Sequence, residues 1–205
     1  MALLFRSVGQ LARQIPGARQ AARLFRQRRH GQSPRAKLLK QIPAGGICVE
    51  IGVDEGDFSA QILRLTKPQC LHLIDPWQHE VGHGLYSIGQ QGMDERFQRV
   101  CDRFRKQVGR GQVQIHRTTS SKGANSFPLR YCDFIYIDGN HLYPFVKQDL
   151  DLYWPKVKHG GYLAGDDYGV EGWWGNGVQI AVDEFAQEQS LSPELIGTQF
   201  VIRKS

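Results

Sequence analysis

Short apolar runs along the chain alternate with longer segments in which apolar residues recur at helical spacing. Five of these runs have the composition of buried strands and are predicted at Ile47–Val53, Cys70–Asp75, Val113–Arg117, Cys132–Ile137 and Tyr162–Gly165. Two further strands, Glu194–Ile196 and Gln199–Arg203, follow each other without an intervening helix. This order predicts an α/β fold with a mostly parallel, seven-stranded sheet that ends in an antiparallel pair, with helices on both faces.

Amphipathic helices are predicted between the strands, near residues 58–65, 93–108, 144–153 and 178–185. The polar, glycine-rich connection from Gln78 to Gly92 is long for a loop and is a candidate substrate lid. Its His79, His83 and Tyr86 have no recognised metal-ligand spacing, so we interpret them as surface residues.

Acidic residues follow two of the predicted strands. Asp138 and His141 come after the fourth strand, and Asp166 and Asp167 come after the fifth. Because the carboxyl ends of parallel strands meet at one edge of a sheet, we expect these side chains to face one crevice. Three carboxylates and an imidazole there favour a hard divalent cation. Alternatively, His141 caps the helix that follows it and the acids only begin turns.

The turn after the first strand has the features of a nucleotide cradle. Gly52 and Gly56 allow a ligand to approach the backbone, and the following helix, which Ser59 can cap, presents free N–H groups. The spacing is not the GxGxxG of a dinucleotide site, and Glu50 within the strand suits a cationic ligand better than a phosphate. Asp75, at the end of the second strand, either accepts hydrogen bonds from ribose hydroxyls or begins the next turn.

Hydroxyl side chains end the third strand, in the run Thr118-Thr119-Ser120-Ser121. At this edge of the sheet they are placed to meet an adenine ring or to cap the next helix. The four cysteines are dispersed and lack a CxxC pair, so we interpret them as buried free thiols of a reducing compartment.

Positive charge is concentrated at the N-terminus. Residues 1–49 carry ten basic and no acidic side chains, whereas the remainder of the chain has a net charge of −4. We therefore divide the chain into a basic amphipathic arm, residues 1–40, and a domain, residues 41–205. The arm is interpreted as a helix that packs on its own domain or on a sister subunit. The alternatives are an anionic membrane surface, organellar targeting and nucleic acid.

Several segments together carry a resemblance to a known family. They are Val49-Glu50-Ile51-Gly52 with Gly56 and Ser59, Ile74-Asp75-Pro76-Trp77, Tyr136-Ile137-Asp138-Gly139-Asn140-His141, Gly165-Asp166-Asp167-Tyr168 and Ala181-Val182-Asp183-Glu184-Phe185. In this order they resemble class I S-adenosylmethionine-dependent methyltransferases. More narrowly, they resemble the small-molecule and sugar O-methyltransferases of the macrolide-sugar group. The resemblance implies a Rossmann-like sandwich of helices around the sheet.

The resemblance also implies roles for individual residues. Those expected to hold the cofactor S-adenosylmethionine are Glu50, Gly52, Gly56, Ser59, Asp75, Ser120, Ser121 and Asp138. Those expected to bind a magnesium ion are Asp138, Asp166 and Asp167, with His141 as the general base beside Asp138. Asp167 stands where catechol-type enzymes carry Asn, which leaves the ligand set open.

We therefore expect an O-methyltransferase whose acceptor is a hydroxyl of a sugar or other small molecule, including a glycan or glycolipid. Its location is expected to be cytoplasmic, with a peripheral contact to the inner membrane surface through the arm, and a homo-oligomer is an open alternative. A nucleic-acid methyltransferase or binding module would use the basic arm, but the domain is acidic and lacks an Asn-Pro-Pro-aromatic motif. An NAD-dependent oxidoreductase is disfavoured by the glycine spacing.

Overall fold

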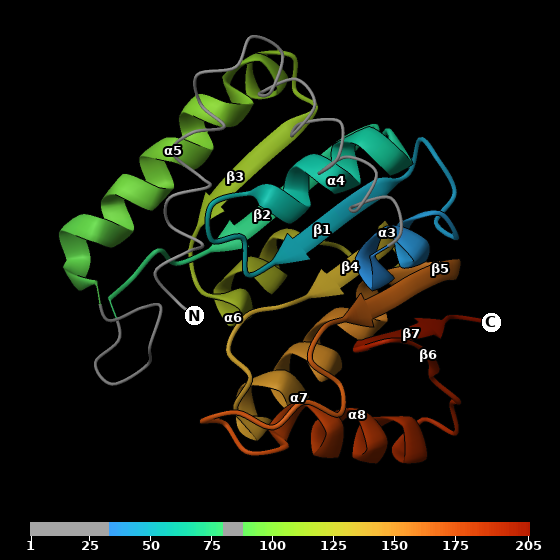
Figure 1. The fold of residues 1–205 in the computed structure, drawn as a ribbon. Helices are drawn as coiled ribbons and strands as arrows, with labels where there is room; N and C mark the ends of the chain where they lie inside the picture. Colours follow the sequence, from blue (N-terminus) through green and yellow to red (C-terminus); the bar gives the residue numbers. More distant parts are fainter. Residues whose placement is uncertain (1–32, 80–87) are drawn as a thin grey trace, which may run out of the picture.

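A seven-stranded sheet forms the centre of the protein, which is described here by a computed structural model covering residues 33–79 and 88–205. The strand order is β3-β2-β1-β4-β5-β7-β6 (Figure 1). The strands are β1 (Ile47–Ile51), β2 (Cys70–Asp75), β3 (Val113–Arg117), β4 (Cys132–Ile137), β5 (Val157–Gly165), β6 (Glu194–Ile196) and β7 (Gln199–Arg203). β1 to β5 pair in parallel, and β7 is antiparallel to both β5 and β6. The predicted α/β class and mixed sheet are confirmed.

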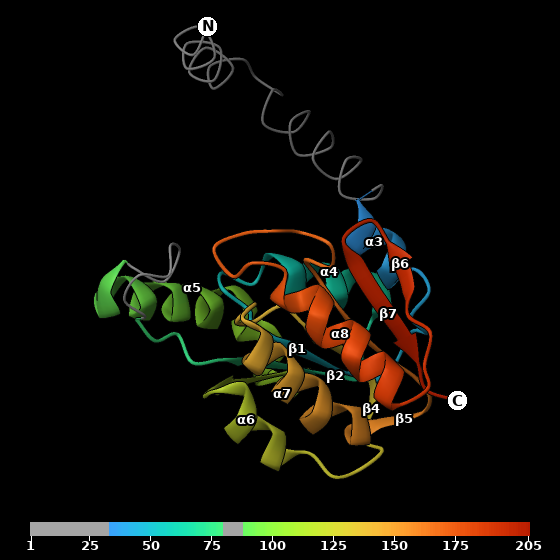
Figure 2. The same ribbon diagram turned by 90° about the horizontal axis from the view of Figure 1, so that it is seen from below.

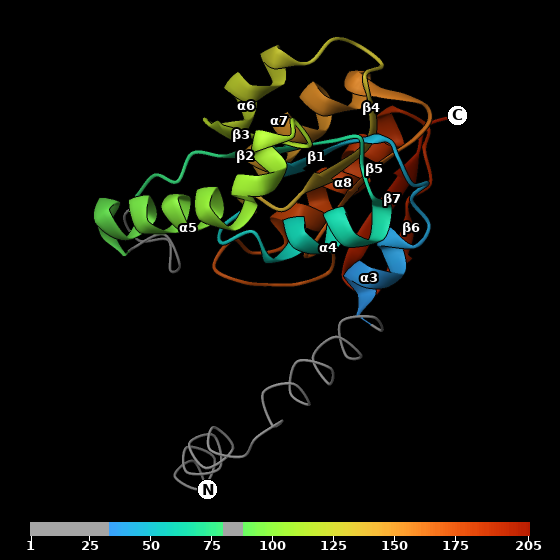
Figure 3. The same cartoon turned by 90° about the horizontal axis from the view of Figure 1, so that it is seen from above.

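Helices cover both faces of the sheet. One face carries α3 (Pro34–Leu39), α4 (Asp57–Thr66) and α5 (Gly89–Gly109), as Figure 3 shows. The opposite face carries α6 (Ser120–Gly123), η2 (Ala124–Ser126), α7 (Tyr143–Tyr153), η3 (Trp154–Lys156) and α8 (Gly177–Glu188), which are in front in Figure 2. Each layer of helices closes a separate hydrophobic core against the sheet. Alternate residues of β1 therefore enter different cores, with Val49 and Ile51 on the α7 side and Cys48 on the α4 side.

The strand predictions agree with the structure except at two ends. β1 stops at Ile51 rather than Val53 because Gly52, with φ of 84°, turns the chain out of the sheet. β5 begins at Val157, five positions before the predicted Tyr162.

The two helix caps considered from the sequence are wrong, and α5 begins at Gly89 rather than at the predicted Met93. α4 begins at Asp57 with Gly56 as its N-cap, so Ser59 lies inside the helix and does not cap it. α7 has Leu142 as its N-cap, which excludes the alternative that His141 caps this helix.

The folded unit begins earlier than the predicted boundary at residue 41. Ser33 caps α3 by accepting a hydrogen bond from the Ala36 N–H at 3.2 Å, and Pro34 occupies the first turn. Leu38 and Leu39 are fully buried in the core on the α4 side. Residues 33–40 are thus part of the domain and do not form a linker or an arm.

Other sequence predictions fall outside the described residues. They are residues 1–32 of the arm that was predicted over residues 1–40, and most of the candidate lid, including His83 and Tyr86. All four cysteines are free thiols as predicted, although Cys101 is only half-buried. Among residues 33–79 and 88–205, no helix is both long enough and apolar enough to cross a membrane.

Truncating Leu38 tests whether α3 belongs to the folded unit. Removing a fully buried leucine side chain leaves a cavity, so Leu38→Ala should lower the free energy of unfolding by about 2–5 kcal/mol in urea denaturation. Lys37→Ala on the same helix replaces an exposed side chain and serves as the control. Equal stability of the two variants would show that α3 does not contribute to the domain core.

Candidate functional site

The ends of β1, β4 and β5 lie level with one another at the carboxyl edge of the sheet. The N–H of Asp138 donates to the last carbonyl of β1 at 2.8 Å, and the N–H of Asp166 donates to the last carbonyl of β4 at 3.3 Å. Gly52 sits against this junction, because a Cβ atom at its position would lie 2.1 Å from the Asp138 carbonyl oxygen. The predicted convergence of the two acidic strand ends is confirmed, and Gly52 is needed for the close approach of the β1 end to the β4 end.

Two cavities open at this edge, where the strand order reverses between β1 and β4. The first has a volume of about 380 Å³ and is lined by residues that include Gly52, Asp75, Ser120, Ser121, Asp149 and Trp174. The second has a volume of about 330 Å³ and is lined by residues that include Arg35, Glu50, Gly52, Phe58, Arg96 and Asp138. His141 and Asp167 line both cavities. The site therefore has two compartments with a shared wall.

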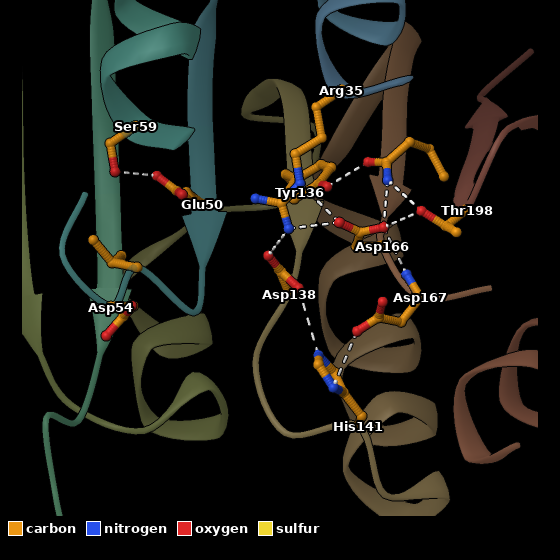
Figure 4. A network of polar contacts seen from close by, with 12 residues as sticks. Arg35, Glu50, Asp54, Ser59, Tyr136, Asp138, His141, Asp166, Asp167 and Thr198 are labelled. Carbon is orange, nitrogen blue, oxygen red and sulfur yellow. Dashed lines mark hydrogen bonds and ion pairs between the residues drawn. The ribbon is translucent and has the colours of Figure 1, made fainter. Parts of the chain in front are cut away.

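Glu50 is a buried acid on the wall of the second cavity. Its side chain is almost fully enclosed, and its carboxylate accepts a short hydrogen bond from Ser59 (Figure 4). Burial, together with the negative charge of Asp138, raises the pKa of Glu50 to about 8, although Ser59 opposes the shift. An ionised Glu50 needs a positive charge beside it, so this position suits the cationic ligand expected from the sequence. The Ser59 hydroxyl thus donates its hydrogen bond to Glu50 and does not cap α4.

Asp75 holds the glycine turn to the end of β2. One of its carboxylate oxygens accepts the N–H groups of Val53 at 2.9 Å and Asp54 at 3.1 Å, and the other accepts the N–H of Trp77 at 2.7 Å. Burial raises the pKa of Asp75, and these three backbone donors oppose the shift. The carboxylate lines the first cavity and also fixes the backbone there.

Arginines of α5 form ion pairs with the acidic residues of the turn that follows β1. Arg96 pairs with Asp54, Arg99 with Glu55 at 2.9 Å and Arg103 with Asp57 at 2.7 Å. Arg96 is the least exposed of the three arginines. The turn that carries Gly56 is thus fixed between β2 and α5.

The far end of the first cavity contains polar groups from two elements. Ser120 and Ser121 lie there as predicted, and the preceding Thr119 is the residue that caps α6. Asp149 of α7 reaches the same wall and was not anticipated from the sequence. It is 2% exposed, and its Oδ1 atom has no hydrogen-bond partner among the described residues. Burial raises the pKa of Asp149 to about 7, although the Ser120 hydroxyl opposes the shift. A buried acceptor of this kind suits a ligand that donates a hydrogen bond.

His141 stands between two carboxylates at the wall shared by both cavities. Its Nε2 atom lies 3.4 Å from Asp138 and its Nδ1 atom lies 3.3 Å from Asp167, while the edge of Trp174 packs on the ring. Burial lowers the pKa of His141, but the two carboxylates outweigh burial and leave it raised. Asp167 adopts φ of 59°, a left-handed conformation that aspartate tolerates. The ring is therefore held by its neighbours and has enhanced basicity.

Arg35 occupies the space between the acids that were expected to bind magnesium. Its Nη2 atom lies 2.6 Å from Asp138 and 2.5 Å from Asp166, as Figure 4 shows. Asp166 additionally accepts hydrogen bonds from Thr198 at 2.6 Å, from the Asp167 N–H at 2.8 Å and from Gln199.

The expected trio of Asp138, Asp166 and Asp167 therefore does not fit a magnesium ion, since Asp166 is committed to protein donors. Among the described residues, one group has suitable ligand atoms within 4.8 Å of one another, namely Asp138, His141 and Asp167. This group replaces an oxygen ligand by an imidazole nitrogen, which magnesium disfavours.

Comparison with protein families gives a match over most of the parallel sheet. A family model described as a methyltransferase domain matches residues 49–168. This segment contains Glu50, Asp75, Asp138, His141, Asp166 and Asp167, whereas Arg35 lies before it. No curated protein sequence matches the chain.

Solved structures with the same fold include several methyltransferases. The O-methyltransferase NovP is 21% identical with a TM-score of 0.57, and the match covers 84% of this chain and 80% of NovP. The N-methyltransferase NodS from Bradyrhizobium japonicum WM9 is 16% identical with a TM-score of 0.57, covering 88% and 96%. SMU.1697c from Streptococcus mutans, in complex with SAH, is 13% identical with a TM-score of 0.54, covering 81% and 92%. The fold is shared by enzymes with different acceptor atoms.

The buried Glu50 makes a prediction about stability and pH. In the unfolded chain this carboxyl ionises near pH 4.5, but in the fold it ionises near pH 8. The folded state therefore binds the extra proton between these values, and wild-type stability falls as pH rises through this window. Glu50→Gln removes this cost, so in the ligand-free state its free energy of unfolding should rise relative to wild type by a few kcal/mol from pH 4.5 to pH 8.

Denaturation in urea at several pH values measures this difference, and the exposed Glu171→Gln is the control. A difference between Glu50→Gln and wild type that does not change with pH would contradict the buried-acid assignment.

Proposed function

Because the chain belongs to the methyltransferase-domain family of class I fold, we propose that it transfers a methyl group from S-adenosylmethionine to a hydroxyl of a sugar or other small molecule. The observation that carries this proposal is the position of His141, a basic imidazole on the wall shared by two cavities. The first cavity, together with the end of the second cavity at Glu50, can hold the donor, and the rest of the second cavity can hold the acceptor.

The cofactor is proposed to span the glycine turn. Glu50 and the backbone at Gly52 would receive its cationic amino-acid end, and Asp75 would receive the ribose hydroxyls. The adenine would lie near Ser120 and Ser121, and its exocyclic amino group is a suitable donor to the unpartnered oxygen of Asp149. The volume of the first cavity, about 380 Å³, is in the usual range for a bound small ligand.

The protein's part in the reaction is to position the acceptor and to accept a proton. When bound, the cofactor supplies an electrophilic methyl group. Asp138, 3.4 Å from the buried Nε2, favours the tautomer with its proton on that nitrogen and leaves Nδ1 to take the proton of the acceptor hydroxyl. Asp167, 3.3 Å from Nδ1, then stabilises the imidazolium. No step of this scheme uses a metal ion.

The acceptor and the partners are proposed from charge and chemistry. Carboxylates around the second cavity accept hydrogen bonds from hydroxyl groups, which favours a polyhydroxy acceptor such as a sugar, including one on a glycan or glycolipid. The basic side chains of residues 1–32 would place the enzyme near an anionic membrane surface that carries such acceptors. Association of two copies through the same segment is the alternative use of this charge.

Replacing His141 tests the proposed base. His141→Asn should reduce methyl transfer at least about 100-fold, because the acceptor hydroxyl loses its proton acceptor. The assay follows label from S-adenosylmethionine across a panel of sugar and phenol acceptors. Binding of the product S-adenosylhomocysteine, measured by calorimetry, should stay within about twofold, since the variant keeps the shape of the cavity wall.

The matched control is His159→Asn, which changes an exposed histidine whose ring donates a hydrogen bond to the Ser205 carbonyl, away from both cavities. Near wild-type turnover by His141→Asn would refute the base assignment. Loss of both turnover and product binding would instead indicate that His141 supports the cofactor cavity.

A further inference from the structure

A guanidinium from outside the segment that the family model matches pairs with two of the carboxylates at the site. Arg35 lies on α3, before the matched residues 49–168, and reaches the ends of β4 and β5. Its Nε atom donates to Asp166 at 2.7 Å and its Nη2 atom donates to Asp138 at 2.6 Å. One cation thus neutralises two carboxylates that come from different strands.

The guanidinium is fixed on its flat face as well as at its edge. It lies over the rings of Phe58 and Tyr136, with its central carbon 5.0 Å and 5.8 Å from the two centroids. A guanidinium is protonated at any physiological pH, so the positive charge of Arg35 is permanent.

One nitrogen of Arg35 is directed into the second cavity. The side chain is 33% exposed and lines that cavity together with Glu50 and His141. In Figure 4 the outer guanidinium nitrogen points to the side on which Glu50 lies and has no dashed contact. This Nη1 group can donate to an oxygen atom of a bound molecule while Nε and Nη2 stay paired with the acids.

We propose that Arg35 is the resident cation of the acceptor cavity, taking the place that a divalent metal ion was expected to occupy. This inference rests on the proposed methyl transfer for its meaning in the reaction. Arg35 neutralises Asp138 and Asp166 and offers Nη1 to an acceptor oxygen, so that acceptor binding needs no metal. A divalent ion cannot bridge Asp138 and Asp166 unless the guanidinium leaves, because both would compete for the same carboxylate oxygens.

Manganese titration of the full chain tests the inference without any acceptor. Free Mn²⁺ is followed by its electron paramagnetic resonance signal in wild type, Arg35→Met and Arg35→Lys. Wild type should bind Mn²⁺ only weakly. Arg35→Met exposes two uncompensated carboxylates and should bind at least about tenfold more tightly. Arg35→Lys keeps the positive charge and should remain close to wild type.

Lys37→Met is the matched control, since it removes one positive charge from an exposed position on the same helix. It should bind Mn²⁺ as weakly as wild type. Circular dichroism checks that each variant is folded, and Arg35→Gln replaces Arg35→Met if the latter is not. A gain confined to the variants that lose the Arg35 charge supports the assignment.

Tight, stoichiometric Mn²⁺ binding by wild type would overturn the proposal, because a metal would then displace the guanidinium or use His141 with Asp167. Equal binding by wild type and Arg35→Met would overturn it as well. Calorimetric titration of the same wild-type sample with S-adenosylhomocysteine, with and without EDTA, separates the two proposals. Absence of cofactor binding counts against methyl transfer, whereas the manganese result decides the role of Arg35 independently.

Discussion

The ion pairs of Arg35 allow two carboxylates to lie side by side at the carboxyl edge of the sheet. Asp138 and Asp166 follow neighbouring parallel strands, and without a cation both would be largely buried like charges. An unpaired charge in such a place costs several kcal/mol, whereas a guanidinium that donates to both acids offsets that cost. The same contact fixes α3 against the sheet, so helix packing and charge compensation depend on each other.

The alignment of the ends of β1, β4 and β5 determines how the rest of the site is arranged. Gly52 permits the β1 and β4 ends to approach closely, which places Glu50 on one side of Asp138 and His141 on the other. Asp75 then fixes the glycine turn through three backbone N–H groups. The result is a frame in which the first and second cavities meet at the imidazole of His141.

Much of this arrangement could be predicted because the ends of buried strands can be recognised in the sequence. Buried strands such as β2 and β4 are continuous apolar runs, and an acid that ends such a run is placed at the edge of a parallel sheet without any further information. The convergence of Asp138, His141 and Asp167 followed from that rule alone.

Contacts between distant segments could not be predicted in this way, and neither could the residue that occupies the N-cap position of a helix. Arg35 is 103 residues from Asp138 and is one of eight arginines before residue 50, so no local pattern distinguishes it. Ser59 was misassigned because Gly56 adopts the left-handed conformation and takes the N-cap position. Asp149 had a usable indication, since it falls on the apolar face of α7 beside Val146 and Leu150.

Methyl transfer requires that the site at the glycine turn receive the methyl donor. Calorimetric titration of the full chain with S-adenosylhomocysteine and, separately, with NAD measures this binding. We expect saturable binding of S-adenosylhomocysteine at a single site per chain and no heat with NAD, because Glu50 and the glycine spacing do not suit a pyrophosphate. Binding of NAD, or no binding of S-adenosylhomocysteine, would contradict it.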